Sequence, residues 1–519
     1  MARGPRRFGA AWLPALLLLA CVQPDDRSTF VPTDGGTPDG GVAVDDRDGG
    51  EPTTRDAGGE PVMLVDVGHE RELRGVWVAT VANINFPSRT GLDAEALRAE
   101  LEAIVDTVEA THLNAIFFQV RPESDALYAS ALEPWSRFLT GTQGQDPGLD
   151  PLAELLALAH ARGIEVHAWL NPYRAKSSRS STAVAPHIAV EAPSYAYTYG
   201  NLLWMDPGAE VVQQRLLAVV EDLVARYPLD GLHFDDYFYP YPDGTAFPDD
   251  VTYGAYVNGG GAFDVGDWRR DNVNQMVEAV GDVVSRTDPA CRFGISPFGI
   301  YRPGIPEGIV GLDQYGQIYA DPVKWMAEGW VDYLAPQLYW PSTQTRQAYG
   351  PLIAWWSSLT HGGRAIFAGN YLSKVGTEAA WSVSELETQI ALSRMHRGEA
   401  SLGNIHFHIG PLMENTEDLA TVFAETLYPT PVLTPPLANA PGGALAAPMA
   451  RADGANVELT HTEVEELRAY VIYLFDGGAP RVSRIVAPDA NVTLPSGNYA
   501  VSAVDRFGRE SRGFPIDID

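Results

Sequence analysis

The sequence predicts an α/β protein made of a (β/α)8 TIM-type barrel followed by a small C-terminal β-sandwich of the immunoglobulin or fibronectin III type. Two observations predict this fold. Eight short β-rich runs alternate with segments of helical periodicity between residues 75 and 408. After a proline-rich stretch, the end of the chain contains short apolar runs that are separated by turn residues.

The eight predicted strands share β-branched and aromatic residues. They lie at residues 75–82, 114–121, 164–171, 231–238, 292–298, 331–340, 364–371 and 403–408. Apolar residues at three- and four-residue spacing predict helices such as 93–111, 151–162 and 209–226. An open doubly wound sheet is the alternative. It is disfavoured because no glycine-rich phosphate loop follows the first strand.

The N-terminus has the pattern of an export signal. Residues 1–20 place Arg3, Arg6 and Arg7 before an apolar run that is shorter than the ~20 residues needed to span a bilayer. The run ends at Cys21 in a sequence that resembles the bacterial lipobox, which implies cleavage before Cys21 and lipidation of its thiol. An ordinary signal peptide with an incidental cysteine is the alternative. No Asp follows Cys21, which favours the outer membrane, facing the periplasm, within the cell envelope.

The remaining chain divides by composition. Residues 21–68 are rich in Asp, Gly, Pro and Thr with little apolar periodicity, which predicts a disordered acidic linker behind the lipidated Cys21. The barrel is expected over 69–428, a proline-rich linker over 429–448 and the β-sandwich over 449–519. The sandwich strands are expected at 455–460, 469–475, 484–486 and 499–505, and a spacer or wall-docking role is expected for this domain.

Charge limits the possible partners. The chain has 67 acidic and 36 basic residues and a formal net charge of −31. Nucleic-acid phosphates and anionic lipid surfaces are bound by clustered Lys and Arg, so both classes of partner are disfavoured. Any membrane contact is therefore expected through the lipid anchor alone. The 12 Trp and 22 Tyr would suit the faces of sugar rings, although most are expected in the core.

Two neighbouring acids, Asp235 and Asp236, follow the fourth predicted strand. Barrel active sites lie at the carboxyl ends of the strands. Adjacent strand residues face opposite ways, so only one acid should point to the barrel axis unless the strand breaks, as Pro240 suggests. One acid would then be a general acid with a raised pKa. In the alternative, one of the two acids caps the following loop and only the other takes part in catalysis. After the second strand, Asp125 or Glu123 is the candidate carboxylate partner of Arg121, and Asp125 is also a candidate catalytic acid.

Polar and aromatic residues at the other strand ends predict a cleft for a ligand with many hydroxyls. The candidate substrate-binding residues are Arg121, Asn171, Tyr173, Arg174, Tyr237, Gln337, Tyr339, Trp340 and Asn370. His167 and His233 lie inside strands and are expected to be hydrogen-bonded core residues. Three or four converging ligands for zinc cannot be assembled, and Ser296 lacks a nucleophile elbow, so neither a metal nor another cofactor is expected.

Several ordered segments resemble one bacterial family, the glycosyl-hydrolase-like 10 group, which includes divisome-associated peptidoglycan glycan hydrolases. The segments are residues 72–80, 117–122, 125–128, 134–136, 139–141, 163–174, 230–240, 268–274, 294–299 and 332–340. The resemblance implies a (β/α)8 barrel and cleavage of β-1,4 bonds in cell-wall glycan. The chain departs from the family pattern at Glu123-Ser124 and at Met205-Asp206. No Glu closes the seventh strand, so the layout of retaining barrel glycosidases does not transfer.

These observations support two functional hypotheses. The first is an exported, lipid-anchored glycoside hydrolase that cleaves peptidoglycan glycan strands by general acid catalysis from Asp235 or Asp236. The second is a non-catalytic lipoprotein that binds cell wall or polysaccharide in the same cleft, since fold alone does not fix function. Action on another extracellular polysaccharide is a weaker third possibility.

Overall fold

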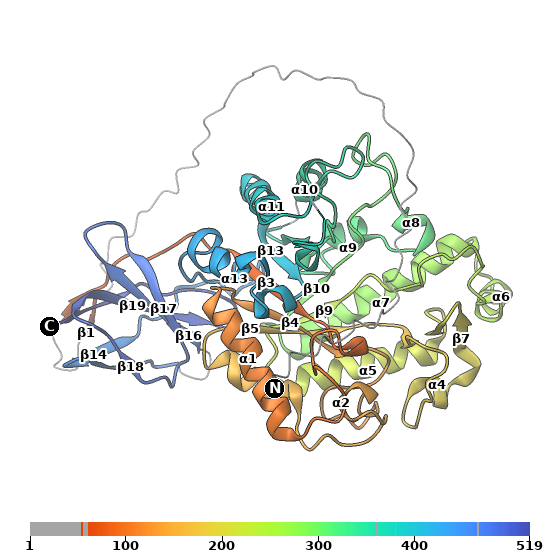
Figure 1. The fold of residues 1–519 in the computed structure, drawn as a ribbon, viewed down its shortest axis with the longest axis horizontal. Helices are drawn as coiled ribbons and strands as arrows, with labels where there is room; N and C mark the ends of the chain where they lie inside the picture. Colours follow the sequence, from red (N-terminus) through yellow and green to blue (C-terminus); the bar gives the residue numbers. More distant parts are fainter. Residues whose placement is uncertain (1–52, 56–60, 360–361, 379, 464–466) are drawn as a thin grey trace, which may run out of the picture. The chain divides into compact units, whose positions relative to one another are not determined.

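The computed structural model describes residues 53–55, 61–359, 362–378, 380–463 and 467–519 (Figure 1). The predicted signal peptide, Cys21 and most of the acidic linker lie outside the described residues. Within the described part of the chain, none of the helices combines the length and the apolar character that crossing a bilayer requires.

Eight parallel strands close into a barrel, as the sequence predicts. They are β3 (Leu73–Val78), β4 (Ala115–Arg121), β5 (Glu165–Leu170), β9 (Gly231–Phe234), β10 (Arg292–Ile295), β11 (Tyr333–Leu334), β12 (Ala365–Asn370) and β13 (Ser401–Phe407). Pairing of β13 with β3 completes the closure. The strand predicted at 331–340 is reduced to β11, because Pro336 has no N–H to donate to the ladder.

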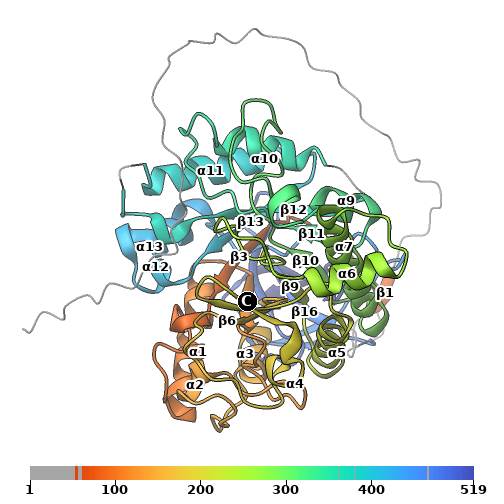
Figure 2. The same ribbon diagram turned by 90° about the vertical axis from the view of Figure 1, so that its right-hand side faces the viewer.

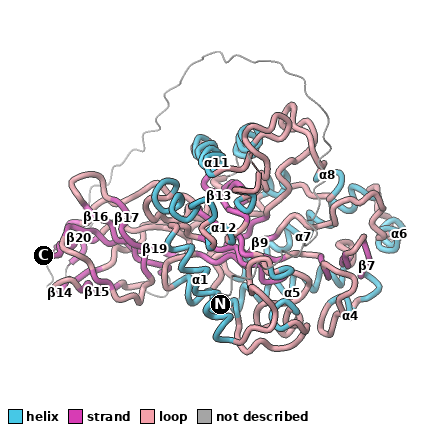
Figure 3. Tube along the Cα trace, in the orientation of Figure 1, coloured by secondary structure: helices cyan, strands magenta, loops and turns pink. Residues whose placement is uncertain are grey.

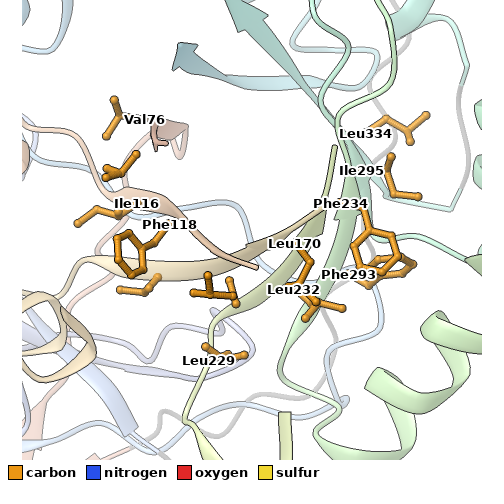
Figure 4. Packing of buried hydrophobic residues seen from close by; sticks show 14 of the residues in the cluster. Val76, Ile116, Phe118, Leu170, Leu229, Leu232, Phe234, Phe293, Ile295 and Leu334 are labelled. Carbon is orange, nitrogen blue, oxygen red and sulfur yellow. The ribbon is translucent and has the colours of Figure 1, made fainter. Parts of the chain in front are cut away.

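Side chains alternate between the two faces of each barrel strand and so form two apolar layers. Trp77, Phe117 and Tyr333 belong to the cluster that fills the barrel. Their neighbours in sequence, such as Val76 and Ile116, belong to the layer between strands and helices, part of which Figure 4 shows. His167 and His233 each hydrogen-bond the Tyr333 hydroxyl at 3.0 Å inside the barrel, where the sequence analysis places them.

Helices surround the strands, as the view along the barrel shows (Figure 2). One main helix lies between each pair of successive barrel strands: α1 (Ala94–Ala110), α3 (Pro151–His160), α5 (Glu210–Arg226), α7 (Val265–Thr287), α9 (Pro322–Glu328), α10 (Tyr349–Ser357) and α11 (Val383–Met395). The side chains of Asp93 and Asp150 accept hydrogen bonds from the first turns of α1 and α3, which explains where these helices begin. All three helices predicted by residue range are present.

Additional short elements follow the carboxyl ends of β5 and β9 and are joined by loops (Figure 3). A small antiparallel sheet consists of β6 (Arg174–Lys176), β8 (Leu202–Met205) and β7 (Ala196–Tyr199), and α6 (Asp250–Asn258) follows β9. The other short helical elements are η1 (Val81–Asn83), α2 (Arg137–Thr140), α4 (Ile188–Glu191), η2 (Pro193–Tyr195), α8 (Gln314–Gln317), η3 (Leu372–Lys374), α12 (Gly410–Met413), η4 (Thr416–Asp418), α13 (Leu419–Val422) and η5 (Phe423–Leu427).

Two antiparallel sheets form the C-terminal region. One contains β14 (Met449–Asp453), β15 (Asn456–Thr460) and β18 (Val492–Thr493), and the other contains β17 (Arg481–Val486), β16 (Leu467–Phe475), β19 (Gly497–Asp505) and β20 (Phe514–Ile518). Tyr470, Ile472 and Val501 lie in their shared apolar core. The sequence analysis did not predict β14, whose side chains are mostly exposed and carry no apolar alternation.

The segment predicted as a proline-rich linker packs against both folded parts of the chain. Leu433 is buried with Val471 and Val504 of the C-terminal sheets, and its carbonyl accepts a hydrogen bond from the Glu72 N–H at 3.1 Å. Its apolar residues alternate with Pro and Thr in the sequence, and their burial orders the segment. Part of the predicted acidic linker is also paired: β1 (Thr53–Arg55) pairs with β2 (Pro61–Met63), and Val65 forms a bridge with Gly513.

Candidate active site

Asp235 lies directly after the last residue of β9. It continues the inward direction of Gly231 and His233, and only 4% of its surface is exposed. The Trp169 Nε1–H donates to its carboxylate at 3.0 Å and the Asn171 Nδ2 donates at 3.1 Å. Both donors come from the end of β5, so the neighbouring strand fixes the position of this acid.

The surroundings of Asp235 favour its protonated form. Burial, the largest cause, and the neighbouring Asp236 carboxylate together raise the pKa of its carboxyl to about 7. The Arg174 guanidinium and the Trp169 hydrogen bond oppose this shift. Asp235 can therefore hold a proton near neutral pH and release it, as a general acid must.

Asp236 is held from the other side of β9. Its carboxylate accepts a hydrogen bond from the Tyr241 hydroxyl and is also hydrogen-bonded by the Gln337 side chain after β11. Burial raises the pKa of Asp236, and these two hydrogen bonds lower it. Because β9 ends at Phe234, the chain turns and Asp236 need not point outward. The break expected near Pro240 thus occurs at the acid pair itself.

Partly exposed aromatic rings lie around the acids. The guanidinium of Arg174 lies 5.3 Å from the centre of the Tyr237 ring. The rings of Tyr339 and Tyr371 stack with centres 4.6 Å apart and an angle of 28°. Trp340 packs edge-on against Phe298 at 5.5 Å. Such rings offer apolar faces to the C–H groups of a sugar.

Three predicted substrate-binding residues are engaged in the packing of the barrel. Arg121 forms a buried ion pair with Glu133 and not with the expected Glu123, which pairs with Arg137. Asn370 donates to Gln389 at 2.9 Å inside the fold. Tyr173 has no exposed surface. Their predicted contact with substrate therefore stays a prediction that these surroundings do not favour.

Asp125, the third predicted catalytic acid, is held by other elements than Asp235. Its carboxylate accepts hydrogen bonds from the Glu123 N–H at 3.0 Å and the Gln143 Nε2 at 3.2 Å. Burial and the charge of Glu123 raise its pKa to about 7. All of these contacts come from the loops that follow β4, whereas Asp235 is bound by β5 and β9.

No metal centre is evident among the described residues, since no three or more His, Cys, Asp or Glu side chains are grouped to hold an ion. His406 instead hydrogen-bonds the Tyr428 hydroxyl at 3.1 Å, and His408 contacts the Asn85 amide at 2.9 Å. Burial lowers the pKa of His406 to about 3 and that of His408 to about 4. Both rings are therefore neutral near pH 7.

The sequence analysis omitted two residues that hold the acids, Trp169 and Tyr241. Trp169 lies two residues before Asn171 on the same face of β5, so strand alternation could have identified it. Tyr241 belongs to the aromatic and proline run after Asp236. Only the turn of the loop brings its hydroxyl back to the acid, and no sequence pattern predicts that turn.

The chain is similar in sequence to a known protein family and to several glycosyl hydrolases. The model of a family described as glycosyl hydrolase-like 10 matches residues 72–382. The glycosyl hydrolase YngK of Bacillus subtilis (strain 168) is 38% identical over 386 residues, which cover 72% of this chain and 75% of the relative. The glycosyl hydrolase DigH of Escherichia coli (strain K12) is 32% identical over 410 residues, which cover 73% and 87%. The glycoside hydrolase domain of PgaB (BpsB) from Bordetella bronchiseptica aligns with a TM-score of 0.45 and 13% identity, over 68% of this chain and 98% of that domain.

Proposed function

This chain belongs to the glycosyl hydrolase-like 10 family, and from that membership and its acid pair we propose that it hydrolyses glycosidic bonds with Asp235 as the general acid. One observation carries the proposal. The inward-facing Asp235 carboxyl, at the carboxyl end of a barrel strand, has a pKa raised to about 7 beside a second acid.

The two acids would act in different protonation states. Asp235 transfers its proton to the glycosidic oxygen as the bond from that oxygen to the anomeric carbon breaks. Asp236 accepts hydrogen bonds from Tyr241 and Gln337, which favour its carboxylate form against burial, and in that form it stabilises the positive charge that develops on the sugar ring. Water then adds to the anomeric carbon, and the proton that it loses returns the Asp235 carboxylate to its acid form. Burial, and to a smaller extent the charge on Asp236, favour the protonated form of Asp235 before the reaction.

The proposed substrate is the glycan of peptidoglycan, in strands with or without stem peptides. The partly exposed rings of Tyr237, Tyr339 and Trp340 and the Gln337 amide support a ligand made of sugar rings. The lipobox-like sequence before Cys21 supports export and lipid anchoring in the cell envelope, on the periplasmic face of the outer membrane. The C-terminal sheets would then be an immunoglobulin- or fibronectin III-like module that acts as a spacer or docks on the wall.

Product analysis tests this function. The full chain is incubated with purified peptidoglycan glycan strands, either intact or stripped of stem peptides, and new reducing ends are counted. We expect reducing ends from at least one of these substrates. Binding to the strands without any new ends would support the non-catalytic alternative. Cleavage of an unrelated extracellular polysaccharide, with no cleavage of either wall glycan, would overturn the substrate.

The pH dependence of kcat/KM tests the role of Asp235. A general acid works only while it is protonated, and the pKa of Asp235 is about 7. We therefore expect kcat/KM to be maximal below pH 7 and to fall about tenfold per pH unit well above it. A rate that stays constant from pH 6 to pH 9 would contradict general acid catalysis by this carboxyl.

A further inference from the structure

One hollow of the structure is not lined by the acid pair, and we call it the rim hollow. Its volume is about 350 Å³, and it is lined by Tyr195, Gly208, Ala209, Glu210, Thr252, Ala255, Tyr256, Trp268, Asp271, Asn272 and Gln275. These residues belong to η2, to α6, to the start of α5 and to the first half of α7. They come from segments on the face of the barrel where the strands end. Neither Asp235 nor Asp236 lines it.

One wall of the rim hollow is aromatic. Tyr256 stacks on Phe263 with ring centres 6.3 Å apart and an angle of 13°, and its ring lies 6.2 Å from that of Trp268. Phe263 is 46% exposed although it is a large apolar residue. Flat apolar rings of this kind fit the C–H face of a sugar.

Another wall contains one side-chain hydrogen-bond donor without a partner. Asn272 is 91% buried, and its Nδ2 has no hydrogen-bond partner in the described part of the chain. Helix α5, whose first residue Glu210 also lines the hollow, begins without a side-chain cap. A buried donor without an acceptor is unfavourable, and a ligand oxygen would correct this.

The charge of the lining excludes acidic ligands. The only charged lining residues are Glu210 and Asp271, and the described lining has no Lys or Arg. Side-chain amides hold both carboxylates: Gln214 donates to Glu210 at 2.7 Å and Gln275 donates to Asp271 at 2.6 Å. The hollow therefore suits a neutral ligand that carries several oxygen acceptors.

Asp206 stabilises the shape of the rim hollow by joining two of the segments that line it. Its buried carboxylate accepts a hydrogen bond from the Gly208 N–H at 2.8 Å and another from the Thr252 hydroxyl at 2.7 Å. It thereby joins the start of α5 to α6. A Cβ at Gly208 would lie 2.5 Å from the Trp268 ring, so the glycine allows Trp268 to form the wall. The site is thus built before any ligand arrives.

We propose that the rim hollow binds one neutral pyranose residue of a glycan chain, as an accessory site separate from the acid pair. Its volume lies near the lower end of the ~300–1,000 Å³ typical of small-molecule sites, which suits a single sugar ring. This inference rests on the proposed function for its ligand class. It adds that the protein holds its glycan at a second point on the same face.

Hydrogen exchange of the full chain with chitotriose, a neutral N-acetylglucosamine trimer, tests the accessory site. We expect slower exchange of backbone amides at residues 208–212 and 268–275 when the trimer is present. Tyr256→Ala and Asn272→Leu should each weaken this protection, with an apparent Kd about 3- to 10-fold higher. Glu278→Gln, an exposed change on the same helix outside the hollow, is the matched control and should leave it unchanged.

The outcomes separate this inference from the proposed hydrolase. Cleavage of glycan without protection at these residues would overturn the accessory site and leave the hydrolase standing. Protection at these residues without cleavage of any glycan would support the accessory site and overturn the hydrolase. Equal protection by an acidic trimer of glucuronic acid would overturn the neutral ligand class.

Discussion

Replacing Asp235 by Asn should lower kcat on glycan strands by about 10²- to 10⁴-fold, the usual contribution of a positioned general acid. Asn keeps the size of the side chain and can still accept hydrogen bonds from Trp169 and Asn171. It has no acidic proton to give to the leaving oxygen. The loss should therefore fall on kcat, while the affinity for uncleaved glycan stays within about threefold.

A matched control and a pH profile make this prediction specific. Asp243→Asn removes the same charge from an exposed position on the same loop and should keep its activity. The residual activity of Asp235→Asn should no longer fall above pH 7. If Asp235→Asn retains full activity with the fold intact, Asp235 is not the acid, and Asp125, whose pKa is also about 7, becomes the next candidate.

The neighbouring acid has a different expected signature. The charge of Asp236 is one cause of the raised pKa of Asp235. In Asp236→Asn that repulsion is absent, so the alkaline limit of any remaining activity should move to lower pH. The same measurement therefore distinguishes an acid from the charge that keeps it protonated.

The sequence predicted the barrel well because each strand buries two faces and each helix buries one. Runs such as residues 114–121 are long and apolar, and they match β4 closely. Pro297 and Pro336 shorten their strands more than the apolar runs around them suggested. Proline has no N–H to donate, so the hydrogen-bond ladder ends there even where the following residues are apolar. The observed β10 and β11 are accordingly shorter than predicted.

The candidate site was predictable only in part. Alternation from His233 places Asp235 inside the barrel, and this much follows from β9 alone. Its partners Trp169 and Asn171 depend on the register between β5 and β9, and Tyr241 depends on the path of a loop. A strand-end position also does not show whether a polar side chain faces the ligand or the protein. Arg121 illustrates this ambiguity.

Removing the Arg121 guanidinium should unfold the barrel more easily rather than weaken substrate binding alone. Its Nε and Nη2 donate to Glu133 at 2.6–2.9 Å, and its Nη1 donates to the Asn171 carbonyl at 2.7 Å. Both side chains of this ion pair are at most 2% exposed. Arg121→Met would leave the Glu133 carboxylate buried without its partner, which costs about 3–5 kcal/mol in the free energy of unfolding.

Denaturant titration of the full chain measures this cost, with Arg98→Met as the matched control, because the Arg98–Glu154 pair is exposed and its loss should shift the unfolding midpoint little. The double variant Arg121→Met/Glu133→Leu should recover much of the lost stability, since it leaves no unpaired charge. If Arg121→Met instead keeps its unfolding midpoint and only raises KM, Arg121 contacts substrate, as its place at the end of β4 first suggested. The buried pair would then contribute little to the stability of the fold.

Arg121 also holds the carbonyl of Asn171, whose side chain donates to Asp235. A destabilised Arg121→Met that remains folded should therefore lose kcat as well.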